Sequence, residues 1–142
     1  MRILFEPRTN ELAVEASGRE LGALAALLEN DAGAVYDDCI VARRANEAYS
    51  KCLSRIIVDR VESGNVRISV QGDESLVVTG DARTLALLAA NIAFAARMPA
   101  GEHMHIEHYP GHLWLTEDSY PLVVEKTRDT EGPNQVRSCV RP

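Results

Sequence analysis

The sequence predicts an α+β fold: one antiparallel sheet with two helices packed side by side on one face. Three observations lead to this prediction. Short segments of alternating apolar residues occur in pairs around turn residues, as in β-hairpins. Two Leu- and Ala-rich segments that begin with a helix-capping residue follow these hairpins. The order hairpin, helix, strand occurs twice within 142 residues, enough chain to bury one substantial core.

The first hairpin is expected from residues 2–6 and 11–16, which flank a turn containing Pro7. A helix should follow directly, because Ser17 and Glu20 form a capping box, in which each side chain pairs with the other residue's backbone N–H. The apolar stripe of this helix then faces the sheet.

The second hairpin is expected from the alternating residues 66–70 and from 76–79, around a turn at Gly72-Asp73. Asp81 is the predicted N-cap of the second helix, which ends before Pro99. This helix is apolar on nearly all sides, so it must be buried on more than one face, against the other helix or in a dimer interface.

Two parts of the chain have similar sequences. Residues 11–26 align with 75–90 without a gap at an offset of 64, and residues 54–60 resemble 120–126 at an offset of 66. A chance match of two Leu- and Ala-rich helices is the alternative, but the strand before the helix and a later strand match as well. We therefore predict a duplicated unit. The expected parts are a first hairpin-helix-strand unit over 1–64, a second unit with a His-rich hairpin over 65–126, and a flexible tail over 127–142.

Residues 31–51 carry the weakest signal. Within them, 35–41 is expected to be a strand and 43–49 a turn or a short helix.

All four histidines lie between residues 103 and 112, next to a turn signal at Pro110-Gly111. The turn predicts a hairpin of residues 102–108 and 112–116. A loop of two or of four residues gives the same register and separates apolar from polar side chains. That register places Met104, Ile106, Leu113 and Leu115 on a core face, and His103, His105, Glu107 and Trp114 on the other face, with Asp118 opposite His103.

Two histidines at positions i and i+2, with a carboxylate across the ladder, are a weak metal-site pattern. The candidate ligands are His103, His105 and Asp118. The alternative, and the favoured interpretation, is an exposed sheet face whose His and Trp side chains are partner contacts or ordinary surface. The sequence contains no nucleophile elbow, Walker loop or dinucleotide-binding glycine motif, so we expect no catalytic residue and no cofactor.

The charge and the cysteines narrow the class of protein. With 15 Lys and Arg against 21 Asp and Glu, the net charge is −6, which disfavours binding to nucleic acid or to an anionic membrane. Three cysteines without a CxxC pair predict neither a disulfide framework nor a zinc knuckle. The N-terminal residues show no secretory signal, and the longest apolar run, 85–96, is shorter than the roughly 20 residues that span a bilayer. We expect a cytoplasmic protein.

Residues 80–90, His103-Met-His-Ile-Glu107 and Ser119-Tyr-Pro-Leu-Val-Val-Glu125 together resemble a family of small bacterial proteins, the immunity protein 32 group of polymorphic toxin systems. The resemblance extends over residues 66–126. It implies a small binding protein that neutralises a cognate toxin by stoichiometric binding, without catalysis.

An acidic inhibitor suits a basic toxin such as a nuclease. Two other classes stay open: a small metal-dependent or histidine-based enzyme, and a homodimeric adaptor that uses the second helix. The expected partner contacts are Trp114, His103, His105, Glu107, Asp37 and Asp38.

Overall fold

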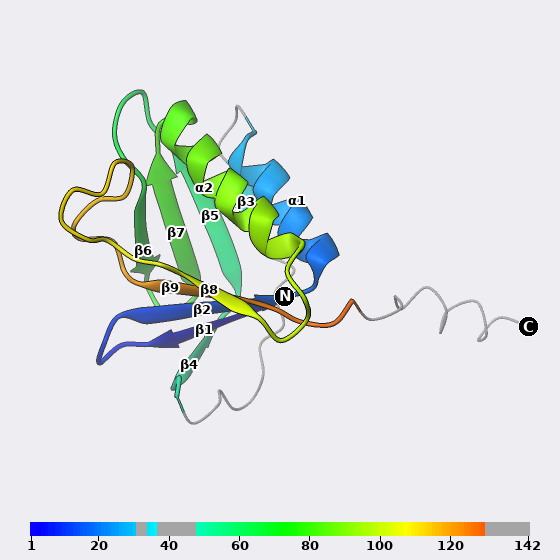
Figure 1. Cartoon of the computed structure of the whole chain (residues 1–142). Helices are drawn as coiled ribbons and strands as arrows, with labels where there is room; N and C mark the ends of the chain where they lie inside the picture. Colours follow the sequence, from blue (N-terminus) through cyan, green and yellow to red (C-terminus); the bar gives the residue numbers. More distant parts are fainter. Residues whose placement is uncertain (31–33, 37–47, 130–142) are drawn as a thin grey trace, which may run out of the picture.

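Two β-sheets and two helices make up the fold (Figure 1). The computed structural model describes residues 1–30, 34–36 and 48–129. The elements are β1 (Arg2–Glu6), β2 (Glu11–Ala16), α1 (Gly18–Leu28), β3 (Ala34–Tyr36), β4 (Lys51–Leu53), β5 (Arg55–Arg60), β6 (Arg67–Gln71), β7 (Ser75–Gly80), α2 (Ala82–Ala96), β8 (His103–Ile106) and β9 (Leu122–Lys126). The predicted α+β class, both early hairpins and both helices are confirmed.

The strands are divided between two sheets, which differs from the single antiparallel sheet expected from the sequence. The first sheet has the order β4-β1-β2-β9-β8 and the second has the order β3-β5-β7-β6. Each sheet contains one parallel pair, β2 with β9 and β5 with β7, among antiparallel neighbours. Parallel strands cannot be joined by a tight turn, and here both helices and several strands lie between β2 and β9, whereas β6 alone lies between β5 and β7.

After each helix a later strand returns to the sheets, β5 in the first half of the chain and β9 in the second. Each of these strands pairs with a strand of the hairpin in the other half of the chain. In the first sheet Leu12 lies opposite Leu122, and in the second Leu76 lies opposite Ile56. Leu12 and Leu76 are equivalent at the offset of 64, and Ile56 and Leu122 are equivalent at the offset of 66. These matching registers support the duplication, which stays a prediction. Both halves of the chain therefore contribute strands to both sheets.

Both helices begin at the predicted capping residues. At α1, Ser17 Oγ accepts a hydrogen bond from the Glu20 N–H at 3.2 Å, and Glu20 Oε2 accepts one from the Ser17 N–H at 2.9 Å. At α2, Asp81 Oδ1 accepts a hydrogen bond from the Thr84 N–H at 2.8 Å. This bond, together with one from the Gly64 N–H, lowers the pKa of Asp81. Each cap satisfies N–H groups that have no partner within the helix.

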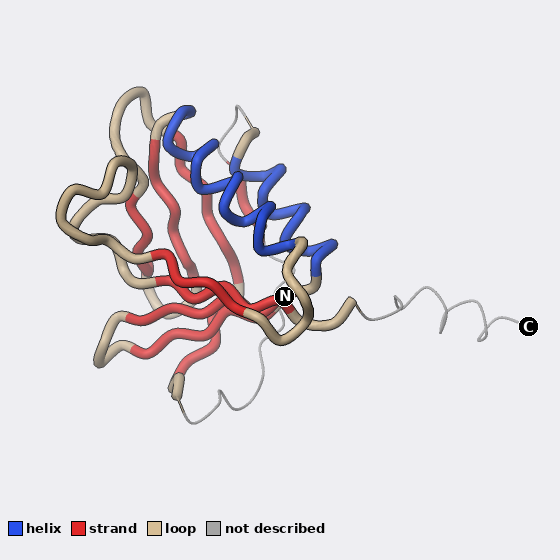
Figure 2. Tube along the Cα trace, viewed as in Figure 1, coloured by secondary structure: helices blue, strands red, loops and turns tan. Residues whose placement is uncertain are grey.

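The two helices pack closely against each other, and α1 begins where α2 ends. A Cβ atom added to Gly18 would lie 2.8 Å from the carbonyl oxygen of Ala96, so only glycine fits at this contact. The two helices lie side by side against the strands (Figure 2), and one cluster of buried apolar side chains includes residues of both helices and both sheets. Neither described helix has both the length and the hydropathy needed to cross a bilayer.

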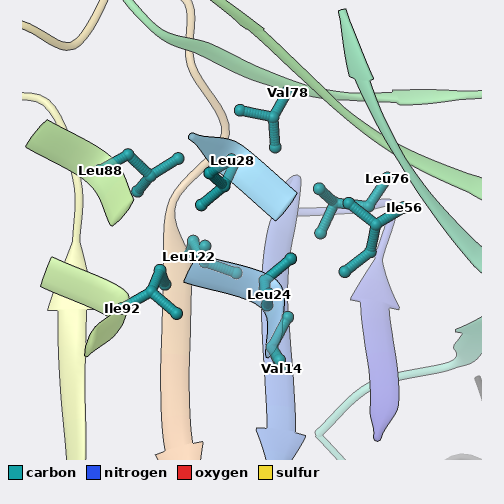
Figure 3. A pocket seen from close by; sticks show the side chains of 9 residues that line it. All are labelled: Val14, Leu24, Leu28, Ile56, Leu76, Val78, Leu88, Ile92 and Leu122. Atoms are coloured by element: carbon teal, nitrogen blue, oxygen red, sulfur yellow. The ribbon is translucent and has the colours of Figure 1, made fainter. Parts of the chain in front are cut away.

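A small cavity of about 20 Å³ lies in the middle of this core (Figure 3). Leu24 and Leu28 of α1, Leu88 and Ile92 of α2, and strand residues of both sheets line it. Such a volume holds at most one water molecule, and a wholly apolar lining offers a water no hydrogen bond. The cavity is therefore a packing void and no ligand site.

Several expectations fall partly or wholly outside the described residues. Of the strand expected over 35–41, the structure describes the part that belongs to β3, and residues 43–47 of the next expected segment are not described. At the predicted tail, the Thr127 N–H donates to the Ala16 carbonyl at 2.8 Å, and Asp129 Oδ1 accepts from the Gly18 N–H at 2.7 Å. The beginning of the expected tail is thus attached to the fold, and residues 130–142 lie outside the described part.

Candidate functional site

The predicted histidine hairpin is wrong. β8 pairs antiparallel with β9, so that Met104 lies opposite Val124 and Ile106 opposite Leu122. Residues 107–121 form a long connection between these strands, which we call the 107–121 loop (Figure 2). This pairing buries Ile106, Leu122 and Val124 against the core, whereas the expected partner strand offered only Leu113 and Leu115. Burial of apolar side chains decides the pairing over the nearby turn signal.

The returning part of the loop follows the edge of the second sheet. The Val66 N–H donates to the Trp114 carbonyl, and the Thr116 N–H donates to the Val66 carbonyl, both at 2.8 Å. Further along, the Tyr120 N–H donates to the Ile68 carbonyl at 2.8 Å. The loop therefore closes the outer edge of β6 and connects the two sheets.

The four side chains predicted for a core face do not share one environment. Ile106 and Leu115 are buried, and Met104 is half-buried against the core, as expected. The prediction for Leu113 is wrong, because its side chain is 82% exposed. Leu115 lies at the bridge to Val66, where Trp114 and Thr116 form the backbone hydrogen bonds, whereas Leu113 precedes this bridge.

The predicted turn at Pro110-Gly111 is confirmed, although it does not join two paired strands. The His112 N–H donates to the Tyr109 carbonyl at 3.0 Å, and Gly111 has φ of 87°, a backbone conformation that favours glycine. The turn reverses the chain within the loop.

An aromatic cluster around His112 organises the loop. The His112 ring lies 4.6 Å from the Tyr109 ring, 4.8 Å from the Trp114 ring and 6.1 Å from the His108 ring, centroid to centroid. His112 Nδ1 accepts hydrogen bonds from the N–H groups of Trp114, at 3.3 Å, and Leu115, at 3.1 Å. Burial and, to a lesser extent, the charge of His108 lower the pKa of His112. The ring is therefore neutral at pH 7, with its proton on Nε2.

The predicted metal ligands are not brought together. His103 and His105 are exposed on β8, with their ring centroids 5.1 Å apart, and the residue opposite His103 is Glu125. Asp118 was expected opposite His103, but it lies in the 107–121 loop and its Oδ2 accepts a hydrogen bond from Arg67 Nε at 2.7 Å. A hydrogen bond from Thr116 and this contact with Arg67 lower the pKa of Asp118. Among the described residues, no three His, Cys, Asp or Glu side chains form a potential metal site.

The predicted partner contacts occupy separate places. Glu107 and Trp114 lie in the 107–121 loop, the first exposed and the second half-buried beside the core. His103 and His105 lie on β8, the edge strand of the first sheet. Asp37 and Asp38 lie outside the described residues.

A second exposed apolar surface lies on α2. Leu87 and Phe94, seven residues apart and so on one side of the helix, are 38% and 59% exposed, whereas Leu85, Leu88 and Ile92 are buried. The helix contacts α1 as well as β7 and β9, so it is buried on more than one face as expected, and the side of Leu87 and Phe94 is left exposed.

Fold and site together define a small α+β domain that carries an exposed aromatic loop tied to both sheets. Residues 75–127, from β7 to just beyond β9, match a family described as Immunity protein 32. The resemblance inferred from the sequence is confirmed over this segment, which contains α2, β8 and the 107–121 loop. Comparison with curated proteins and with solved structures gave no match.

Proposed function

We propose that this protein is a cytoplasmic immunity protein that neutralises a cognate toxin by binding it stoichiometrically. The observation that carries this proposal is the match of residues 75–127 to the Immunity protein 32 family. Such a protein acts by occupying a surface of the toxin, and its own residues perform no reaction.

The charge of the chain supports a basic toxin, such as a nuclease, as the partner. The net charge is −6, and complementary charges raise the rate at which two proteins associate. The proposed contacts within the described residues are Glu107 and Trp114 in the 107–121 loop and His103 and His105 on β8. Tryptophan is enriched among the residues that dominate binding energies, which favours Trp114 among them.

The test examines the genes that neighbour this one for a toxin domain and co-expresses that domain with this protein. Cells that produce the toxin domain alone should stop growing, and cells that produce both proteins should grow. The purified pair should elute as a 1:1 complex in size-exclusion chromatography with light scattering. Growth arrest in the presence of this protein, with no complex between the two, would contradict the proposal.

A homodimeric adaptor is the second candidate, favoured by the exposure of Leu87 and Phe94 on α2. Light scattering of the free protein measures this directly. A dimer that Phe94→Ala converts to a monomer supports the adaptor, whereas a monomeric wild-type protein argues against it.

A further inference from the structure

The 107–121 loop exposes apolar side chains that the core does not use. Leu113 is 82% exposed and Tyr109 is 58% exposed, and among the described large apolar residues Leu113 is the most exposed. A single exposed leucine is ordinary on a protein surface. Here, however, two such side chains and the half-buried Trp114 lie within six residues of one loop.

The backbone that carries Leu113 is held on both sides. Before it, the Tyr109–His112 turn is closed by a hydrogen bond of 3.0 Å. After it, the N–H groups of Trp114 and Leu115 donate to His112 Nδ1, and the carbonyl of Trp114 accepts from Val66. A side chain presented on an ordered backbone loses little conformational entropy when a partner binds it.

The charges of the loop are of one sign. Residues 107–121 contain Glu107, Glu117 and Asp118 and no Lys or Arg. Asp118 is paired with Arg67 of β6, whereas Glu107 and Glu117 are exposed and free to meet a cationic group on a partner. An apolar centre with an acidic rim is complementary to an apolar pocket surrounded by Lys and Arg.

We propose that Leu113 and Tyr109 are the apolar anchors by which this protein docks into a pocket of a basic protein partner, with Glu107 and Glu117 contacting cations at the rim. The inference rests on the proposed function, because the partner is taken to be the toxin. It adds the binding residues and the chemistry of the toxin surface that they recognise.

The experiment uses isothermal titration calorimetry to measure the Kd of the full chain for the toxin domain identified in the co-expression test. Leu113→Ala and Tyr109→Ala should each raise the Kd at least about tenfold, as expected for anchor residues. Phe94→Ala on α2 is the matched control, since it also removes an exposed apolar side chain, and it should leave the Kd unchanged. Glu117→Lys should raise the Kd and weaken the dependence of the Kd on salt.

The thermal midpoint Tm of each variant separates binding from folding, and the Tm of Leu113→Ala should match that of the wild type because the Leu113 side chain is 82% exposed. If the wild type binds the toxin and Leu113→Ala and Tyr109→Ala bind equally well, the anchor assignment is overturned and the immunity function stands. If Phe94→Ala weakens binding as much as Leu113→Ala does, the helix face and not the loop is the docking surface. If the wild type does not bind the toxin, both the function and the anchor assignment fall.

Discussion

His112 Nδ1 accepts a hydrogen bond from the backbone N–H of Leu115 at 3.1 Å, and this contact depends on a neutral imidazole. Protonation of Nδ1 would remove the acceptor and leave two N–H groups of the loop without their partner. The conformation of the 107–121 loop is therefore linked to pH.

The free energy of unfolding should decrease as the pH falls below the usual histidine value of 6.5. The pKa of His112 is lowered in the folded protein, so the unfolded chain takes up the proton first. Urea unfolding at pH 7.5 and pH 5.5, followed by the fluorescence of Trp114, the only tryptophan, measures the loss. His112→Asn keeps an acceptor but does not titrate, so the free energy of unfolding of this variant should decrease less between these pH values. An equal loss in both proteins would show that other groups cause it.

Gly18→Ala should destabilise the protein by about 1–3 kcal/mol, the usual cost of overpacking. The added Cβ would lie 2.8 Å from the Ala96 carbonyl oxygen, and backbone atoms of two packed helices cannot move apart cheaply. Gly22→Ala is the matched control, because a Cβ there meets no atom within 4 Å. Since alanine favours a helix over glycine, this second change should stabilise the protein by about 0.5–1 kcal/mol. Chemical denaturation of the wild type and the two variants measures these changes in the free energy of unfolding. Equal effects of Gly18→Ala and Gly22→Ala would contradict the close helix contact.

Asp81→Ala should lower the urea midpoint at pH 7, because the side chain accepts hydrogen bonds from the Thr84 and Gly64 N–H groups at the start of α2. These bonds lower the pKa of Asp81, so its contribution is complete above the ordinary aspartate value of 3.8 and is lost as the pH falls below it. The difference between wild type and variant should shrink accordingly in acid. Asp81→Asn, which keeps one acceptor without the charge, should fall between them at pH 7.

Zinc should leave the Tm of the protein unchanged. His103 and His105 are neighbours on β8, but Asp118 is held by Arg67, and the described residues bring no third ligand to the pair. Differential scanning fluorimetry with and without zinc tests this, with His105→Ala as the control. A zinc-dependent rise in Tm that His105→Ala abolishes would reinstate the metal site.

Features set by local chemistry were predictable from the sequence. The capping box at Ser17, the N-cap at Asp81 and the turn at Pro110-Gly111 involve residues within four positions of each other, and all three occur as expected. The partner of β8 was not predictable in the same way. Its alternating residues Met104 and Ile106 suit either neighbour, and the choice is made by core burial between distant segments.

The wrong prediction of a core position for Leu113 follows from the pairing of β8 with β9. It concerns the candidate site directly, because Leu113 lies in the 107–121 loop. Once β9 pairs with β8, the residues after the turn lose their place in the ladder, and of Leu113 and Leu115 only Leu115 is buried. The same change moves Asp118 away from His103 and toward Arg67. The outward position of Leu113 is a property of the folded chain that alternation alone does not reveal.

The exchange of strands between the two halves has a consequence during synthesis. Leu12 is synthesised long before Leu122, its partner in the parallel pair, so this edge of β2 has no partner until β9 has been made. Contacts this distant in sequence slow folding. During that interval the exposed edge is open to pairing with other chains. A cell that depends on this protein therefore gains no folded copy from a prematurely terminated chain that lacks β9.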